Sequence, residues 1–258
     1  MLVQSGPIKV WSVIVTVMGD LCQSRRDRIG SQLLNRLLNR MGITGQAARV
    51  AIHRLRRDGW IESERQGRTS AYFLSDLGWQ QTQAVRATIY SPDPVRDRTP
   101  ALVLGDPGRS AAEFAEALPQ GALILGPRAA LIEGEPEACS GEMVGVAFCP
   151  RSVPSWLQGF VLDDDMRAGY AALHEVVSRV CEGAVPSDAL DRTVIRLLTL
   201  HHWRRLRLRH GGLQDALLPD DWEGARARDA VMTVLARYPR ARLAGLAHCD
   251  GQDRPGST

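Results

Sequence analysis

The sequence predicts an α+β protein built from three segments. Residues 1–90 combine helical patterns with a hairpin pattern, residues 91–162 mix short strand patterns with helical ones, and residues 163–258 are mainly helical. A chain of 258 residues with 44% hydrophobic content is long enough to bury more than one core. Three prolines and alternating charges in residues 91–100 indicate a boundary between the first two segments.

The first segment carries the positive charge of the chain. Residues 1–80 hold 12 Lys and Arg residues against 6 Asp and Glu residues, whereas the whole chain has a net charge of only +3. Nearly all of this excess is arginine, with Lys9 the single lysine. A basic segment on a near-neutral body is typical of proteins that bind a phosphate polymer, and a solvated arginine-rich surface is the alternative.

The first two elements differ in how clearly they can be predicted. Residues 8–22 are apolar and β-branched, so local propensity favours a strand, but a buried helix would show the same pattern and stays open. Residues 29–42 predict a helix, because Leu33, Leu34, Leu37, Leu38 and Met41 recur at helical spacing. Gly42 is a suitable stop for this helix.

A second helix is predicted after Thr44, which is a good N-cap residue. With 100° of rotation per residue, one face of this helix is small and apolar and suits close packing on its predecessor; it carries Ala48, Ala51, Ile52 and Leu55. The opposite face carries long polar and basic side chains, with Arg54 and Arg56 at its flanks: Gln46, Arg49, Val50, His53 and Arg57.

A hairpin is predicted directly after this basic helix. Asp58-Gly59 ends the helix, residues 60–65 and 70–74 read as strands, and residues 66–68 form the turn with Arg65 and Arg68 at its tip. Helix, short turn, basic helix and basic-tipped hairpin is the order of a winged helix-turn-helix. We therefore expect contacts with double-stranded DNA from eight side chains: Gln46, Arg49, Val50, His53, Arg54, Arg57, Arg65 and Arg68.

The remaining segments predict a small mixed domain and a helical one. Residues 91–162 give the order β-α-β-β-β-α, which favours a ferredoxin-like domain. Residues 163–258 give three amphipathic helical patterns and a polar tail. The second of these patterns is rich in arginine at positions 204, 205, 207 and 209, which suits the phosphates of a coenzyme A, although a solvated or domain-bridging helix face explains it equally well.

No constellation of residues predicts catalysis or a cofactor. The five cysteines occur singly, and His201, His202 and His210 lack matched metal-ligand spacing, so neither a metal site nor a disulfide framework is expected. No serine lies in a nucleophile elbow, and no glycine-rich loop leads to a P-loop lysine. The early apolar run is too short to span a bilayer and lacks a cleavage site, so we expect a soluble, cytoplasmic protein.

Several stretches resemble the PaaX family, the repressors of phenylacetic acid degradation. The resemblance is carried by GITGQAARVAIHRLRRDGWIESERQGRTSAYFLSDLG at residues 42–78, TIYSPDP at 88–94, HHWRR at 201–205 and ALLPDDWEG at 216–224. It therefore touches all three segments. Its most specific parts are the hairpin tip and the C-terminal LLP-x-D-W pattern.

The resemblance implies a homodimeric winged-helix repressor of an aromatic or fatty acid catabolic operon, such as one for phenylacetate, released from its operator by an acyl-CoA thioester. It also implies that residues 8–22 form the first helix. Effector-binding candidates are Trp203, Arg204, Arg205 and Trp222, which could hold an anionic head and an apolar tail. The alternative function is an acyl-CoA-processing or nucleic-acid-cutting enzyme with an accessory DNA-binding domain; the missing catalytic constellation favours the non-enzymatic repressor.

Overall fold

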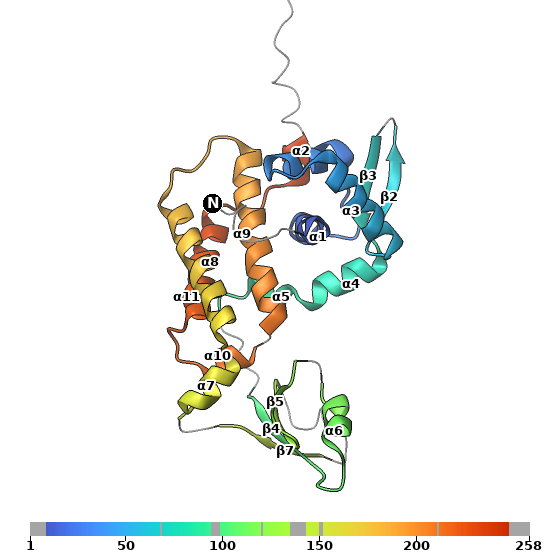
Figure 1. Ribbon diagram of the computed structural model, residues 1–258. Coiled ribbons are helices and arrows are strands. Elements are labelled where there is room, and N and C mark those ends of the chain that lie inside the picture. Colours follow the sequence, from blue (N-terminus) through green and yellow to red (C-terminus); the bar gives the residue numbers. More distant parts are fainter. Residues whose placement is uncertain are drawn as a thin grey trace, which may run out of the picture. The chain divides into compact units, whose positions relative to one another are not determined.

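The computed structural model describes residues 9–67, 69–93, 99–119, 121–134, 143–149, 152–210 and 212–247. The chain is an α+β protein, as predicted, and divides into two compact units (Figure 1). Unit 1 comprises Met1–Ile89, Glu175–Arg204 and Ala230–Thr258, and unit 2 comprises Tyr90–His174 and Arg205–Asp229. The division falls inside three C-terminal helices, so residues 163–258 contribute to both units.

Unit 1 begins with three helices and a small sheet. Its elements are α1 (Val10–Leu21), β1 (Ile29–Gly30), α2 (Ser31–Arg40), α3 (Gly45–Arg57), β2 (Ile61–Gln66), β3 (Thr69–Leu74), α4 (Asp76–Ala84) and α5 (Arg86–Tyr90). The sheet is antiparallel with strand order β1-β3-β2. The strand that local propensity favours for residues 8–22 is wrong, and the helix that the family resemblance implies there is correct.

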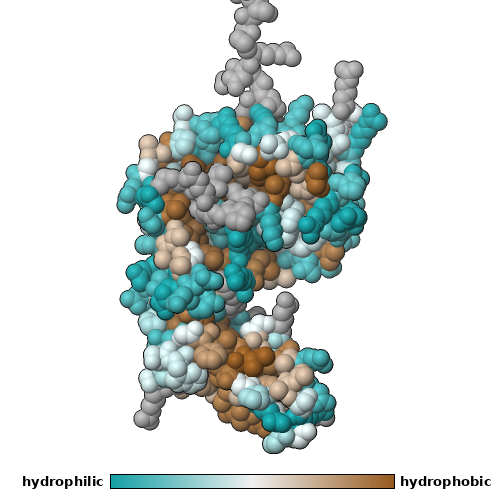
Figure 2. Space-filling view, in the orientation of Figure 1, coloured by the Kyte–Doolittle hydropathy of each residue, from teal (hydrophilic) through white to brown (hydrophobic). Residues whose placement is uncertain are grey.

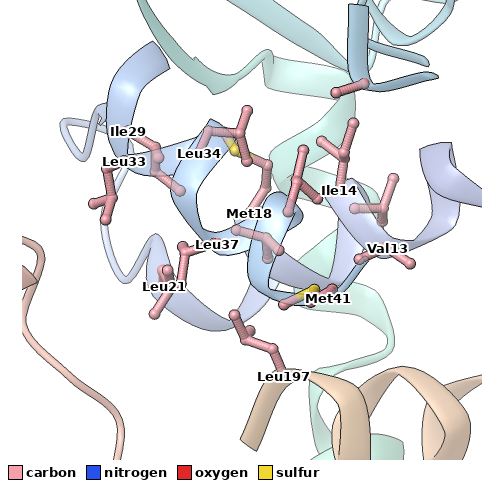
Figure 3. Close-up of a cluster of buried hydrophobic side chains, with 14 of the residues drawn as sticks. Val13, Ile14, Met18, Leu21, Ile29, Leu33, Leu34, Leu37, Met41 and Leu197 are labelled. Carbon is pink, nitrogen blue, oxygen red and sulfur yellow. The ribbon is translucent and has the colours of Figure 1, made fainter. Parts of the chain in front are cut away.

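The β-branched run forms a helix because it is buried in a helical core. Val13, Ile14, Val17 and Met18 of α1 are at most 1% exposed, and packing of this kind outweighs local strand propensity. Figure 3 shows Val13, Ile14 and Met18 among side chains of α2 and of the C-terminal part of the chain. Leu197 from α9 (Ala189–His210) belongs to the same cluster, so C-terminal residues complete the core of the first segment.

Unit 2 contains a four-stranded antiparallel sheet. Its elements are β4 (Ala101–Gly105), α6 (Ala111–Ala117), β5 (Leu123–Gly126), β6 (Ala129–Ile132), β7 (Met143–Ala147) and α7 (Ser155–Val161), in the predicted order of strands and helices. The sheet order is β5-β6-β4-β7. Phe114 of α6 packs with Val103, Ala130 and Ile132 to form a small core on one side of the sheet.

The remaining helices are α8 (Asp164–Glu182), α9, α10 (Leu213–Leu217), α11 (Glu223–Arg237) and α12 (Leu243–Ala247). Their number is larger than the three helical patterns read from the sequence, because α10 and α12 are single short turns of helix. Among the helices that the structure describes, none is long and apolar enough to cross a membrane.

Candidate nucleic-acid interface

Helix α3 is fixed on the rest of unit 1 by its cap and its small apolar face. The Thr44 hydroxyl accepts a hydrogen bond from the Ala47 backbone N–H at 3.3 Å, which confirms the predicted N-cap. All four predicted inward-facing residues are buried: Ala48, Ala51, Ile52 and Leu55. Two of them are alanines, so the backbone of α3 lies close to α1 and α2, which it contacts. The opposite face therefore has a fixed orientation.

The outward face of α3 is open to solvent over its whole length. Gln46, Arg49, Val50 and His53 are all exposed, and Val50 keeps 62% of its surface accessible although it is apolar. The Arg49 guanidinium donates a hydrogen bond to the Gln46 side-chain oxygen at 3.0 Å, so the two side chains at the start of the helix form one polar group. Donors and acceptors arranged in this way suit the edges of DNA bases.

The C-terminal half of α3 borders a groove. Arg57 and His53 line a cavity of ≈ 480 Å³ together with Arg56, Ile61, Glu62 and Ser63. Arg57 donates to Asp58 at 3.2 Å, and Arg54 donates to the same carboxylate at 3.4 Å. The Arg54 guanidinium also lies 5.4 Å from the ring centroid of Trp11, within the range of a cation–π interaction.

Arg56 is a further candidate for DNA contact, and it is not among the eight residues predicted from the sequence. On the helical wheel it lies at the flank of the outward face, and the signal that could have found it is its place beside Arg57 at the end of the helix. In the structure Arg56 is exposed and lines the groove with His53 and Arg57. Glu62 on the facing strand is the single acidic side chain among the described residues that line this groove.

The hairpin forms as predicted, with a shorter turn between its two strands. Strand β2 extends to Gln66 and β3 begins at Thr69, one residue earlier than expected, and Gln66 pairs with Thr69. Gly67 has a φ of 60°, a left-handed conformation that favours glycine at this turn. Arg65 is exposed and donates to the Gly67 carbonyl at 3.2 Å. Arg68 lies outside the described residues.

The base of the hairpin is anchored by a close backbone approach. The Ser75 hydroxyl donates to the Gly59 carbonyl and accepts from the Gly78 N–H at 3.0 Å, and the Ser75 N–H donates to the Trp60 carbonyl at 3.1 Å. These bonds tie the end of β3 and the start of α4 to the start of β2. A Cβ on Gly78 would lie 2.1 Å from the Trp60 carbonyl oxygen. Only glycine therefore fits at this position.

Replacing Gly78 by alanine should lower the free energy of unfolding by about 1–3 kcal/mol, because the added methyl group forces the backbone of α4 away from Trp60. Thermal unfolding followed by circular dichroism measures this. Gly45→Ala on α3 is the control, since a Cβ there meets nothing within 4 Å. Equal stability of the two variants would contradict the anchoring role of the Trp60–Gly78 approach.

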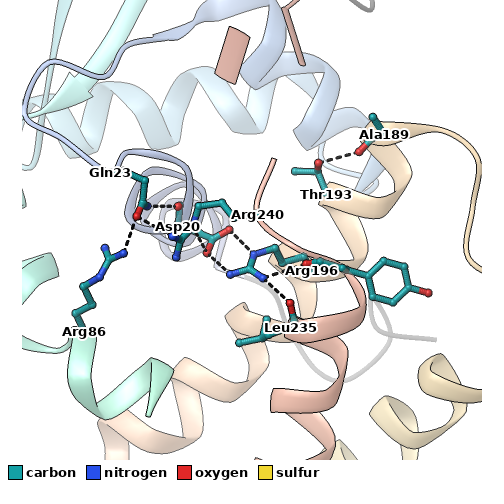
Figure 4. A network of polar contacts seen from close by, with 9 residues as sticks. Asp20, Gln23, Arg86, Ala189, Thr193, Arg196, Leu235 and Arg240 are labelled. Carbon is teal, nitrogen blue, oxygen red and sulfur yellow. Dashed lines mark hydrogen bonds and ion pairs between the residues drawn. The ribbon is translucent and has the colours of Figure 1, made fainter. Parts of the chain in front are cut away.

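Helix α1, on which α3 packs, is joined to C-terminal residues of unit 1 by buried ion pairs (Figure 4). Asp20 accepts two hydrogen bonds from Arg196 of α9, at 2.8 and 3.0 Å, and one from Arg240 at 3.2 Å. Arg196 also donates to the carbonyl groups of Leu235 and Tyr238, at 3.1 and 3.0 Å. The support of α3 is therefore built from both ends of the chain.

The four effector-binding candidates occupy different environments. Trp203 is 1% exposed and donates its indole N–H to the Ile89 carbonyl at 2.9 Å. Arg204 donates to the backbone and side-chain oxygens of Ser12, at 2.9 and 2.8 Å, and to the Thr16 hydroxyl at 3.2 Å. Trp203 and Arg204 belong to unit 1, and these hydrogen bonds use both side chains in its packing. Arg205 and Trp222 belong to unit 2.

Trp222 is the candidate that borders a pocket. It lies in edge contact with Tyr170, at a centroid distance of 5.0 Å, and lines a cavity of ≈ 150 Å³ together with Pro219, Arg228 and neighbouring residues. Burial raises the pKa of Tyr170 to about 12. Arg205 is exposed.

Groups of three or more His, Cys, Asp or Glu side chains that could hold a metal ion do not occur among the described residues.

Two protein-family models match this chain, one near each end. Residues 9–78 match the family model for PaaX-like protein, and residues 163–244 match the model for the PaaX-like protein C-terminal domain. The transcriptional repressor PaaX of Escherichia coli (strain K12) is 27% identical over 267 residues, covering 94% of this chain and 84% of that protein. Among solved structures, the uncharacterized protein Rv0674 from Mycobacterium tuberculosis has a similar fold, with a TM-score of 0.51 and 16% identity over 93% of this chain and 98% of that one.

Proposed function

Because the chain belongs to the PaaX-like family, we propose that it is a transcriptional repressor that binds operator DNA through a winged helix-turn-helix. In this proposal α2 and α3 form the helix-turn-helix, α3 is the recognition helix, and the β2–β3 hairpin is the wing. The similar protein from Escherichia coli is named a transcriptional repressor. In this chain, the exposed polar face of α3 is the surface proposed to bind operator DNA.

The observation that carries this proposal is the outward face of α3. Its polar side chains are exposed while its inward face is fixed on α1 and α2, so the N-terminal half can enter a major groove without any rearrangement of the core. In this proposal Gln46, Arg49, Val50 and His53, which are all exposed, contact base edges. The exposed arginines of the C-terminal half, Arg54, Arg56 and Arg57, contact phosphates.

Selection of duplexes from a random-sequence pool by the full chain tests this proposal. We expect enrichment of one motif, and a dissociation constant for the enriched duplex that is at least 10³-fold lower than for a shuffled duplex, as is typical of specific DNA recognition. Fluorescence anisotropy at one stated salt concentration measures both constants. A pool that shows no enriched motif, or equal affinity for enriched and shuffled duplexes, would contradict sequence-specific binding.

The wing should contribute phosphate or minor-groove contacts. Replacing Arg65 and Arg68 together by alanine should lower the slope of log K against log salt by about 0.9 for each phosphate contact that is lost. Arg65 is exposed and donates to the Gly67 carbonyl of its own turn, so its loss should not unfold the hairpin. Anisotropy titrations over a series of salt concentrations measure the slope. An unchanged slope in a folded variant would show that the wing does not touch DNA.

The other segments have proposed roles in assembly and response. We divide the chain into a winged helix-turn-helix domain at 1–90, a ferredoxin-like domain at 91–162 and a helical domain at 163–258. The antiparallel sheet order β5-β6-β4-β7 supports the ferredoxin-like assignment, since the two strands that flank α6, β4 and β5, are separated by β6. The repressor is proposed to act as a homodimer, with one winged domain for each half-site.

A coenzyme A thioester of an aromatic or medium-chain acid is the proposed inducer, and the regulated genes are proposed to serve the catabolism of such acids. A thioester that prefers the DNA-free arrangement should weaken operator binding by about 1–3 kcal/mol. Reciprocity requires the operator to weaken thioester binding by the same factor. In this proposal the exposed Arg205 contacts a phosphate of the coenzyme A.

Calorimetry of thioester binding, with and without the enriched duplex, measures this coupling. Free coenzyme A and the free acids serve as controls. If a panel of aryl and alkyl thioesters shows no binding at millimolar concentration, or binds without changing the affinity for DNA, the inducer assignment is wrong while the DNA-binding proposal stands.

A further inference from the structure

Val50 is an apolar side chain on the polar outward face of α3. Four residues spaced by four, three and four positions form one stripe along this face: Gln46, Val50, His53 and Arg57. The other three members of the stripe are polar or basic. Figure 2 shows mainly hydrophilic residues over the elements that Figure 1 labels α3, β2 and β3. Val50 therefore interrupts a stripe that is otherwise built from hydrogen-bonding side chains.

The exposure of Val50 is large for an apolar residue of unit 1. Three large apolar side chains are exposed among the described residues of this unit, Val50, Leu77 and Val185, and their accessible fractions are 62%, 46% and 46%. The four apolar residues of the inward face of α3, by contrast, are at most 8% exposed. The core of unit 1 therefore gains little from the valine, and its methyl groups become buried only when an apolar group of a ligand covers them.

The major groove of DNA offers one apolar group to such a side chain. All four bases present hydrogen-bond donors or acceptors there, and thymine alone adds a C5-methyl group. A valine packed on a polar base edge would remove water from donors and acceptors without replacing their hydrogen bonds, which is unfavourable. Valine also has one strongly preferred side-chain rotamer in a helix, so its methyl groups are held in place before DNA binds. The chemistry of this position therefore fits thymine.

We propose that Val50 recognises the C5-methyl group of one thymine in each operator half-site. This inference rests on the proposed function of α3 and adds the base that its apolar residue selects. Val50 lies in the N-terminal half of α3, the part of a recognition helix that contacts base edges. The Cα atoms of Arg49 and Val50 are about 3.8 Å apart, and successive base pairs are about 3.4 Å apart. The thymine should therefore lie within about two base pairs of the guanine that Arg49 contacts.

Replacing single thymines of the selected duplex by deoxyuridine tests the inference, because this change removes one methyl group and keeps every hydrogen-bonding group of the base. With the wild-type protein, the dissociation constant should rise about fourfold at one thymine of each half-site, as expected for the loss of one buried methyl-sized contact. The other thymines should tolerate the change. Fluorescence anisotropy at one salt concentration measures the dissociation constant of each duplex.

The variant Val50→Ala assigns the methyl contact to this side chain. It should bind the thymine duplex about as weakly as the wild type binds the deoxyuridine duplex, and it should no longer distinguish the two duplexes. Val185→Ala is the matched control, because it makes the same change at an exposed valine between α8 and α9, outside α3. This control should keep the fourfold difference between the two duplexes. Circular dichroism checks the folding of both variants.

Two results would overturn the thymine contact while leaving DNA binding by α3 in place. In the first, the wild-type protein tolerates deoxyuridine at every thymine within about two base pairs of the guanine that Arg49 contacts. In the second, Val50→Ala still distinguishes the two duplexes as the wild type does. A random-sequence pool that yields no enriched motif would instead contradict the proposed function, and this inference with it. The wild-type titrations need no variant, so they decide the question even if Val50→Ala fails to fold.

Discussion

Replacing Asp20 by alanine should lower the free energy of unfolding by about 3–5 kcal/mol, the range expected when one partner of a buried ion pair is removed. Asp20 is 1% exposed and accepts hydrogen bonds from both Arg196 and Arg240. Arg196 is itself 5% exposed, so the substitution leaves a buried guanidinium without its counter-charge. Urea titration followed by circular dichroism measures the loss.

Asp191→Ala is the matched control for this experiment. Asp191 also pairs with an arginine, Arg40, and the pair likewise joins α9 to the N-terminal helices, but both side chains are exposed to solvent by 40% or more. An exposed ion pair contributes roughly 0–1 kcal/mol. If Asp20→Ala destabilises the protein no more than Asp191→Ala, the buried network does not support α1 in the way described.

Replacing Arg49 by alanine should weaken binding to the selected duplex by about 1–3 kcal/mol, or roughly five- to 150-fold, and should weaken binding to a shuffled duplex much less. Arg49 is exposed on the outward face of α3 and shares a hydrogen bond with Gln46. A bidentate contact with a base is lost only on the duplex that presents this base. Fluorescence anisotropy with both duplexes measures the difference.

Arg179→Ala serves as the control for Arg49→Ala. Arg179 is an exposed arginine of α8 in unit 1 that pairs with Glu175 at 2.8 Å, and it removes the same charge from a helix that has no proposed role in DNA binding. Its affinity for both duplexes should equal that of the wild type. Equal losses on the selected and shuffled duplexes for Arg49→Ala would assign Arg49 to a phosphate contact.

The local architecture of the first segment could be predicted because its signals are short-range. The 3.6-residue period of α3 separates Ala48, Ala51, Ile52 and Leu55 from the polar face, and all four are buried. The N-cap at Thr44 and the hairpin follow from residue types within a few positions of each other. The outward face of α3, which carries the proposed function, was therefore visible in the sequence.

Helix α1 was harder to predict because its stability depends on distant residues. A signal was nevertheless present: Ser12, Thr16 and Asp20 are spaced by four residues, which places three polar side chains on one face of a helix. In the structure Ser12 and Thr16 accept hydrogen bonds from Arg204, and Asp20 pairs with Arg196. These partners lie more than 170 residues away in the sequence, so pattern analysis of residues 8–22 could not identify them.

The arginine-rich part of α9 shows the same limit. Its sequence suits either phosphate binding or a helix face that joins parts of the protein, and composition does not separate the two. In the structure Arg204 donates to α1, and Arg207 pairs with the buried Asp215 at 2.9 Å. Arg205 is the exposed member of the adjacent pair at positions 204 and 205, so it is the better place to begin a search for effector phosphates.

Methylation protection by dimethyl sulfate on the selected duplex tests the central claim, that α3 reads bases in the major groove, because this reagent modifies guanine N7 in that groove. We expect two blocks of protected guanines whose centres lie one helical turn, or a multiple of it, apart. In each block Arg49→Ala should restore the reactivity of a guanine. If bound wild-type protein leaves every guanine N7 as reactive as in free DNA, α3 does not occupy the major groove.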